Sequence, residues 1–485
     1  MNECYLICPQ AHFYELGTLI REYFPLIHVL EQKVEGAWGL VLSDDEMTAT
    51  LYDEQGTVVR VGRAVEDVEV PFEHFIGDPA KNHAKTALSR ALGEFLPWGI
   101  LTGVRPSKIA YAYLEQGFTE TEITDFLERG YHLRSDKAQL TAKVAAKERS
   151  LMACQQGEDV SVYIGVPFCP TRCSYCSFIS NDSRAYKRYH EDYADCLVKE
   201  ILSAEELFDG RRVRSLYMGG GTPTTLSAEE LQRVLKAVSE VVSLDRFLEI
   251  TVEAGRPDTV TREKLEVLKA FGVNRISINP QTMNQKTLDL IGRRHTVEDI
   301  QTAMELARRV SDWTINMDLI LGLPEEGPEE VAHTFEEIER LAPDNLTVHT
   351  LAVKRASRMN EEGEGAKMLL EDPRALARQM DDMIASSAAL AQRMGLEPYY
   401  MYRQKNMAGN FENVGYSLPG KEGLYNIEIM EERQNILAFG AGGVSKIYEP
   451  AINRISRIPN VKTAPEYISR IDEMISRKRA NASKS

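Results

Sequence analysis

The middle of the chain alternates between short apolar runs and longer amphipathic segments, and this alternation restricts the fold more than any other feature. Six runs have the length and composition of strands: Ser161–Val166, Ser215–Gly219, Phe247–Glu253, Arg275–Asn279, Thr314–Leu321 and Leu346–Val353. The segments between them predict helices: Arg184–Phe208, Ala228–Val242, Arg262–Phe271, Val297–Val310 and Pro328–Leu341. This order is typical of a parallel sheet with right-handed crossovers. We therefore predict an α/β fold with its active site at the carboxyl ends of the strands.

Three of these helices have recognisable starts. Ser227, with Glu230 three residues later, forms a capping-box pattern. Thr261 and Thr296 are suitable N-cap residues. These residues predict where the second, third and fourth helices begin.

Residues 1–150 have a different pattern, which predicts a small α+β domain. Its strand candidates are Cys4–Cys8, Gly39–Leu42, Ala49–Tyr52 and Val58–Val61. Helical segments are expected around His83–Leu96, Lys108–Gln116 and Asp136–Met152. We expect domain boundaries at 1–150, 158–365 and 366–485.

The last of these regions is predicted to be mostly helical. It starts with a long helix, Arg374–Met394, and continues with a segment rich in Tyr, Asn and Gly, Tyr399–Gly423, which we expect to be irregular. The run FGAGGVSK, Phe439–Lys446, then precedes a polar tail that is predicted to be helical.

The composition excludes several classes of function. A chain of 485 residues with 43% apolar residues can bury a core, and a net charge of −16 argues against binding to nucleic acid or anionic lipid. No apolar run approaches membrane-spanning length, and the amino terminus has no basic stretch followed by an apolar core. The seven cysteines fit a reducing compartment. We therefore expect a cytoplasmic protein.

Three of the cysteines, Cys169, Cys173 and Cys176, lie in the run YIGVPFCPTRCSYCSF directly after the first predicted strand. Thiolates spaced C-x3-C-x2-C can bind three irons of a [4Fe–4S] cluster and leave the fourth iron open to a small molecule. The alternatives are free thiols or a zinc site with a histidine such as His190, although no second C-x2-C pair is present.

This motif resembles the signature of the radical S-adenosylmethionine (SAM) enzymes. The flanking PFC and YCSF are similar to the oxygen-independent coproporphyrinogen-III oxidase (coproporphyrinogen dehydrogenase) family, and the resemblance extends from about residue 160 to 446. It implies a partial (β/α)6 barrel at 158–365 and a coproporphyrinogen-oxidase-like region at 366–485. The implied cofactors are a [4Fe–4S] cluster, held by Cys169, Cys173 and Cys176, and SAM.

Further residues match the family's SAM contacts in the expected order. They are Tyr163, Tyr175, Gly220, Gly221, Thr222, Glu253, Gln281, Arg293, Asp318, Ala352 and Val444. A carboxylate at Glu253 can accept hydrogen bonds from the SAM amino group or ribose, and Asp318 matches the aspartate that binds a ribose hydroxyl. The structural alternative for Glu253, Gln281, Arg293 and Asp318 is a polar group at the end of a strand, and for Tyr163 it is a half-buried strand aromatic.

The resemblance also implies the reaction. Reductive cleavage of SAM gives a 5′-deoxyadenosyl radical, which removes a hydrogen from the β-carbon of a propionate. Loss of CO2 and one electron leaves a vinyl group, and two rounds convert coproporphyrinogen III into protoporphyrinogen IX. The implied partners are this tetrapyrrole substrate, a flavodoxin- or ferredoxin-type electron donor and a final electron acceptor.

Two departures from the family pattern bear on the substrate. Phe178 stands where the best-characterised oxidases have a fourth cysteine. A haem chaperone branch shares this feature and carries the string HNxxYW, but the corresponding segment here, Glu412–Ser417, reads ENVGYS. A carboxylate replaces the histidine and is a poor substitute as an iron ligand. Three hypotheses therefore remain: a coproporphyrinogen dehydrogenase, which we favour, a haem carrier, and a radical SAM enzyme for another tetrapyrrole.

Basic side chains are candidates for binding the propionates. These are Arg105 and Lys108, in the run PWGILTGVRPSK, together with Arg294 and Lys354. The structural alternative for this run is a surface loop turned by glycine and proline.

Overall fold

The computed structural model describes residues 3–25, 27–45, 47–64, 78–177, 181–182, 186–352, 357–361, 363, 372–404 and 411–482. The chain divides into two compact units. The first contains residues 1–150, 363–381 and 398–413, and the second contains residues 151–362, 382–397 and 414–485. The three domain boundaries expected from the sequence stay predictions.

The first unit contains a five-stranded sheet with the order β2-β1-β3-β4-β5. Its strands are β1 (Glu3–Ile7), β2 (His28–Leu30), β3 (Gly39–Leu42), β4 (Thr48–Tyr52) and β5 (Val58–Arg63). Helices α1 (Gln10–Tyr23) and α2 (Pro79–Leu92) share a buried core with the sheet. Helices α3 (Ser107–Glu115), α4 (Glu120–Tyr131) and α5 (Ser135–Met152) follow. The sequence predicted α2, α3 and α5 but not α1 or α4.

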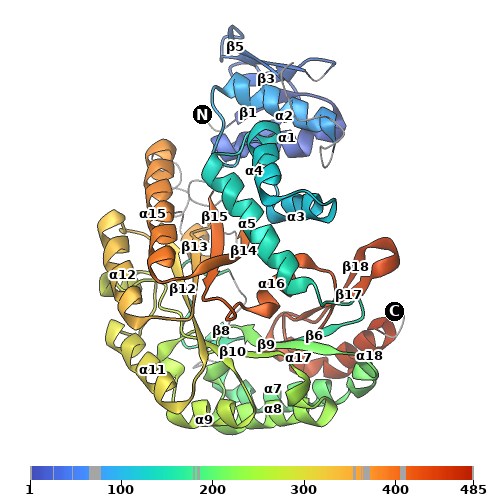
Figure 1. The fold of residues 1–485 in the computed structure, drawn as a ribbon, viewed down its shortest axis with the longest axis vertical. Coiled ribbons are helices and arrows are strands. Elements are labelled where there is room, and N and C mark those ends of the chain that lie inside the picture. Colours follow the sequence, from blue (N-terminus) through green and yellow to red (C-terminus); the bar gives the residue numbers. More distant parts are fainter. Residues whose placement is uncertain are drawn as a thin grey trace. The chain divides into compact units, whose positions relative to one another are not determined.

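The second unit contains a run of six parallel strands in the order β13-β12-β11-β10-β9-β6 (Figure 1). These are β6 (Val160–Val166), β9 (Val213–Gly220), β10 (Glu249–Glu253), β11 (Arg275–Ser277), β12 (Thr314–Leu321) and β13 (Asn345–Thr350). The predicted partial barrel of six strands is therefore present, and β12 has the bounds that the sequence predicted.

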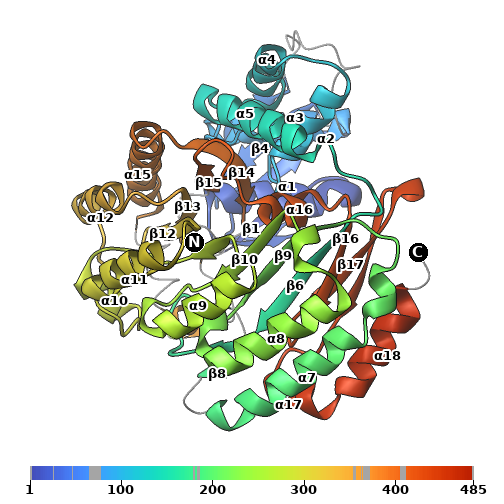
Figure 2. The ribbon, with the colours of Figure 1, turned by 60° about the horizontal axis from the view of Figure 1, so that its bottom comes forward.

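Helices cover the outer face of these strands. They are α7 (His190–Leu202), α8 (Ala228–Val241), α9 (Arg262–Ala270), α11 (Val297–Val310) and α12 (Pro328–Leu341). Figure 2 shows α7, α8 and α9 lying along the outside of β6, β9 and β10. The side chains of Ser227, Thr261 and Thr296 cap α8, α9 and α11 as predicted. Helix α7 is shorter than predicted because 3₁₀ turns flank it.

The chain after residue 372 adds strands as well as helices. Its helices are α15 (Pro373–Arg393), α16 (Leu424–Glu431), α17 (Ala464–Ser469) and α18 (Ile471–Ala482). Strand β16 (Asn435–Phe439) pairs in parallel with β6, and β17 (Val444–Glu449) and β18 (Arg454–Pro459) extend the sheet as antiparallel strands. Next to β13 lies the antiparallel strand β15 (Glu412–Ser417), whose residues Val414 to Ser417 pair with it, and β14 (Glu397–Arg403) precedes β15 in the chain.

The irregular segment predicted at Tyr399–Gly423 was wrong, because it contains most of β14 and all of β15. Every residue of β15 is buried although its sequence is ENVGYS. Pairing with β13 satisfies its backbone, so the polar composition did not prevent a strand. In the part of the chain that the structure describes, no helix is long and apolar enough to cross a membrane.

Candidate active site

The three cluster cysteines lie at the carboxyl end of β6. Cys169 ends the short strand β7 (Phe168–Cys169), and all three side chains are half-buried. The loop is tied to its neighbours: Ser174 N donates to Ile291 O at 3.0 Å, and the Thr171 hydroxyl donates to Gly292 O at 2.9 Å. Its backbone is therefore held against the segment that contains Arg293.

The glycine turn after β9 packs against the same loop. Gly221 N donates to Val166 O and Thr222 N to Phe168 O, each at 2.7 Å. A Cβ atom on Gly221 would lie 2.5 Å from Phe168 O, so no other residue fits there. The Thr222 hydroxyl lies 3.5 Å from Cys169 Sγ. The glycines thus allow two backbone segments to meet beside the cysteines.

Arg293 connects the cysteine loop to the ends of β10 and β11. Its buried guanidinium donates to Gly255 O and to Asn279 O, each at 2.7 Å, and to the Tyr175 hydroxyl at 3.2 Å. Burial raises the pKa of Tyr175 above its usual value, so the phenol stays neutral. Arg293 therefore fixes the aromatic residue that precedes the third cysteine.

Glu253 ends β10 and faces the interior of the barrel. Burial raises the pKa of its carboxyl to about 7, and the nearby charge of Asp318 adds to this effect. A hydrogen bond from the Tyr217 hydroxyl, 2.5 Å from Oε1, acts in the opposite direction. Asp318 itself accepts a hydrogen bond from Asn316 Nδ2 at 2.8 Å.

Gln281 has a backbone conformation that is rare for its residue type. Its φ is +71°, in the left-handed region. Its backbone N–H donates to Asp318 O at 2.9 Å, and its carbonyl accepts from Ile320 N at 3.0 Å, which fixes the side chain beside β12. The buried Oε1 atom has no hydrogen-bond partner among the described residues. Backbone strain together with an unpaired buried acceptor indicates a ligand-binding position.

Val444 and Ala352 lie at the same edge of the sheet. Because β16 is parallel to β6 and β17 runs back, Val444 at the start of β17 is near the carboxyl end of β6. The turn before it is held by Glu200 of α7, whose carboxylate accepts from Gly440 N at 2.8 Å and from Lys478 Nζ at 2.6 Å. Ala352 follows β13 and is half-buried.

The structure therefore brings the predicted cysteines and SAM contacts to one edge of the parallel sheet. Phe178 and Lys354 lie outside the described residues, Arg105 and Lys108 belong to the first unit, and Arg294 is exposed. The sequence did not single out Tyr217 or Tyr425. The only signal for Tyr217 is its position two residues before Gly219, on the inner face of β9.

Comparison with known proteins identifies the family. A model of the radical SAM superfamily matches residues 163–338. The oxygen-independent coproporphyrinogen-III oxidase-like protein HemZ of Bacillus subtilis (strain 168) is 40% identical over 382 residues, which cover 77% of this chain and 75% of that protein. The chain belongs to this radical SAM family. The resemblance inferred from the cysteine motif is confirmed.

Other members match shorter stretches. The oxygen-independent coproporphyrinogen III oxidase of Escherichia coli (strain K12) is 34% identical over 40% of this chain and 42% of its own length. The heme chaperone HemW of Bacillus subtilis is 33% identical over 40% of this chain and 51% of its own length. The structure of E. coli coproporphyrinogen III oxidase (HemN), at 24% identity, covers 68% of this chain and 73% of its own with a TM-score of 0.51. The radical SAM fold is shared.

The cofactors of this family are a [4Fe–4S] cluster and SAM, and the described residues fit them. Three half-buried thiols on one loop suit a cluster, and the unpaired Gln281 Oε1 suits a polar ligand. Among the residues that the structure describes, no three Cys, His, Asp or Glu side chains are arranged to hold a single metal ion. His190, the candidate fourth zinc ligand, packs its ring on Phe168. This ring contact counts against His190 as a zinc ligand.

Proposed function

We propose that this chain is an oxygen-independent coproporphyrinogen dehydrogenase. It would convert two propionates of coproporphyrinogen III into vinyl groups, with SAM as the source of the hydrogen-abstracting radical. The main support for this proposal is one observation. The cysteine loop, the glycine turn and the polar strand ends lie together at one edge of the sheet. The HemZ relative, which is matched over 75% of its length, supports it.

The proposed roles follow from the positions of the residues. Cys169, Cys173 and Cys176 would bind three irons of the cluster, which, when bound with SAM, supplies a carbon-centred radical. Glu253 and Gln281 would hold the methionyl and ribose groups through hydrogen bonds, and Asp318 would bind a ribose hydroxyl. Arg293 would keep Tyr175 against the cofactor. A flavodoxin- or ferredoxin-type protein would deliver the electron.

The position of Glu412 argues against a haem carrier. Glu412 stands where the chaperone string has histidine, and its carboxylate is buried in the first unit. It accepts hydrogen bonds from Lys137 Nζ at 2.6 Å and from Trp98 Nε1 at 3.0 Å. A carboxylate held in this way neutralises a buried lysine and is not presented to an iron.

Anaerobic turnover tests the proposal. The cluster-reconstituted chain is incubated with SAM, a low-potential reductant and coproporphyrinogen III, while mass spectrometry follows 5′-deoxyadenosine and stepwise loss of CO2. We expect both products from the wild type and neither from Cys173→Ala. Deoxyadenosine without loss of CO2 would point to another tetrapyrrole substrate. Tight haem binding without either product would favour the haem carrier.

A further inference from the structure

Tyr217 and Glu253 form a pair inside the barrel that the sequence did not predict. In the register of β9 and β10, Tyr217 lies opposite Thr251, so Glu253 is its diagonal neighbour on the inner face. The phenol donates to Glu253 Oε1 at 2.5 Å. Both side chains are half-buried.

Gly219 provides the space in which the two side chains meet. A Cβ atom at this position would lie 2.7 Å from the Tyr217 ring and 2.8 Å from Glu253 Oε1. Contacts this short force both side chains to move. Since the φ of Gly219 is not in the left-handed region, space and not backbone conformation explains the glycine.

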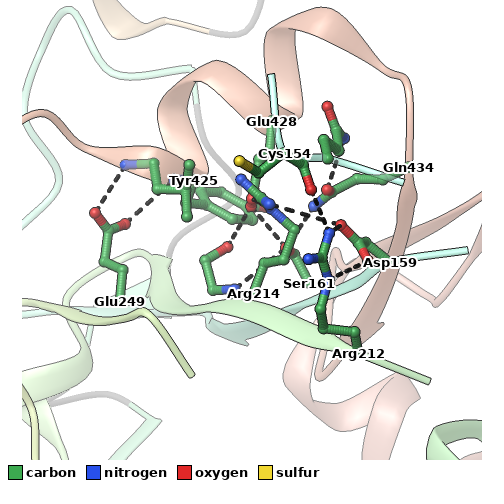
Figure 3. A network of polar contacts seen from close by, with 12 residues as sticks. Cys154, Asp159, Ser161, Arg212, Arg214, Glu249, Tyr425, Glu428 and Gln434 are labelled. Atoms are coloured by element: carbon green, nitrogen blue, oxygen red, sulfur yellow. Dashed lines mark hydrogen bonds and ion pairs between the residues drawn. The ribbon is translucent and has the colours of Figure 1, made fainter. Parts of the chain in front are cut away.

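Tyr425 of α16 packs against the ring of Tyr217. Its ring stacks on that of Tyr217 with the centroids 4.6 Å apart, and the Tyr163 ring lies 6.1 Å from Tyr425. The backbone N–H groups of Leu424 and Tyr425 donate to the carboxylate of Glu249 at 2.8 and 3.2 Å (Figure 3). The first turn of α16 is therefore anchored to β10, with the Tyr425 ring stacked on that of Tyr217.

We propose that Tyr217 is a positioning residue for SAM, because its phenol holds the Glu253 carboxylate toward the glycine turn where the cofactor binds. This inference rests on the proposed role of Glu253. The ionisable groups that face Glu253 are Tyr217 on β9, Asp318 on β12, Tyr163 on β6 and Tyr425 on α16. Tyr217 is the one that donates a hydrogen bond to it, and so favours the charged form that accepts hydrogen bonds from SAM.

Equilibrium binding of SAM to the cluster-reconstituted chain, with the cluster oxidised so that no turnover occurs, tests this role. Tyr217→Phe keeps the ring stack and should raise the dissociation constant about 10-fold, the loss expected for a hydrogen bond to a charged group. Binding should weaken in the wild type as the pH falls through about 7. This midpoint should move to higher pH in Tyr217→Phe. The control Tyr448→Phe, which removes a phenol hydrogen bond to Asn453 on the β17–β18 connection, should bind SAM as the wild type does.

Two further variants separate the possible outcomes. In a Glu253→Gln background, Tyr217→Phe should add nothing, because the two residues act as one unit. Gly219→Ala keeps the phenol but forces the pair apart, so it should weaken binding even if Tyr217→Phe fails to fold. If Glu253→Gln weakens binding and Tyr217→Phe and Gly219→Ala do not, the role of Tyr217 is overturned and the proposed function stands. If the wild type binds no SAM, both fail.

Discussion

The inner face of β6, β9 and β10 carries polar side chains at both ends of the strands. The two ends differ in the hydrogen-bond partners that surround these side chains. At the amino-terminal ends, Ser161, Ser215 and Glu249 contact residues of α16 and make hydrogen bonds with them. At the carboxyl ends, the neighbouring buried polar atoms include several with no hydrogen-bond partner among the residues that the structure describes. One strand pattern, with polar residues at every second position, thus leads to two different environments.

The amino-terminal ends form a closed network around Glu428 of α16 (Figure 3). Arg214 Nε donates to Glu428 Oε1 at 2.8 Å, and the hydroxyls of Ser161 and Ser215 donate to Oε2 at 2.6 and 2.5 Å. Asp159 pairs with Arg212 at 2.6 Å beside them. Burial raises the pKa of Glu428, and these donors oppose that shift. We read this network as structural.

The carboxyl ends of the strands differ, because several buried polar atoms near them lack hydrogen-bond partners in the described part of the chain. Gln281 Oε1, Asn279 Oδ1 and Arg293 Nε have no hydrogen-bond partner among the described residues. Buried polar atoms are costly when unpaired, so they are retained where a ligand completes them. Around Glu428 the polar side chains at the amino-terminal ends of β6 and β9 are paired within the protein, whereas these three residues beyond the carboxyl ends each keep an unpaired buried atom in the described part of the chain.

The largest effect on stability should follow from breaking the closed network. Arg214→Ala leaves the Glu428 carboxylate buried without its cation, and should lower the free energy of unfolding by about 3–5 kcal/mol. Urea titration at 25 °C measures this change.

Arg262→Ala is the matched control, because it removes an exposed pair with Glu266 on α9. It should change the free energy of unfolding by less than about 0.5 kcal/mol. If Arg214→Ala is no more destabilising than this control, the network is not what stabilises the amino-terminal ends.

Removing the charge of Glu253 should have a smaller, pH-dependent effect. The pKa of Glu253 is raised from 4.5 to about 7, so the folded protein holds this proton more tightly than the unfolded chain does. Its contribution to stability is complete below pH 4.5 and is lost as the pH rises through about 7. Glu253→Gln avoids this loss. From pH 5 to pH 8 the variant should gain stability relative to the wild type by at most about 3 kcal/mol, and by less because the side chain is only half-buried.

Urea titrations at the two pH values check this expectation. Glu266→Gln, on the exposed face of α9, serves as the control and should show no such gain. An equal gain in both variants would mean that Glu253 is not strained by its surroundings. The expected result, a variant that is more stable at pH 8 but binds SAM less tightly, is the usual cost of a functional charge.

Local signals in the sequence predicted the structural frame well. β12, α11 and α12 have their predicted bounds, because apolar periodicity and N-cap residues act over a few residues. The cysteine loop was also predicted from a local signal, the C-x3-C-x2-C spacing. α4 was missed although Thr119 and Glu122 form a capping box, so in that case a signal was present and unused.

The closed network and the details of the site could not be predicted in this way. Arg214 and Glu428 are 214 residues apart in the sequence, and only the folded chain brings them together. The left-handed backbone of Gln281 is set by its two hydrogen bonds to β12, not by its own preference. The sequence around Tyr217 is that of an ordinary strand, and only the folded chain shows that its phenol contacts Glu253.

Gln281→Gly should give the smallest change in stability and the sharpest test of the comparison. Glycine adopts the left-handed conformation without strain, and the exchange removes a buried acceptor that no described residue satisfies, so the free energy of unfolding should rise by about 0.5–1 kcal/mol. SAM binding should weaken because the amide is lost. Ala342→Gly is the matched control, since Ala342 also has a positive φ, +45°, but caps the end of α12 just before the amino-terminal end of β13. It should gain similar stability and bind SAM normally.

If both variants gain stability and bind SAM equally well, the strain at Gln281 has no role in the site. If Gln281→Gly loses stability, its side chain belongs to the structural class of polar groups found at the other end of the strands.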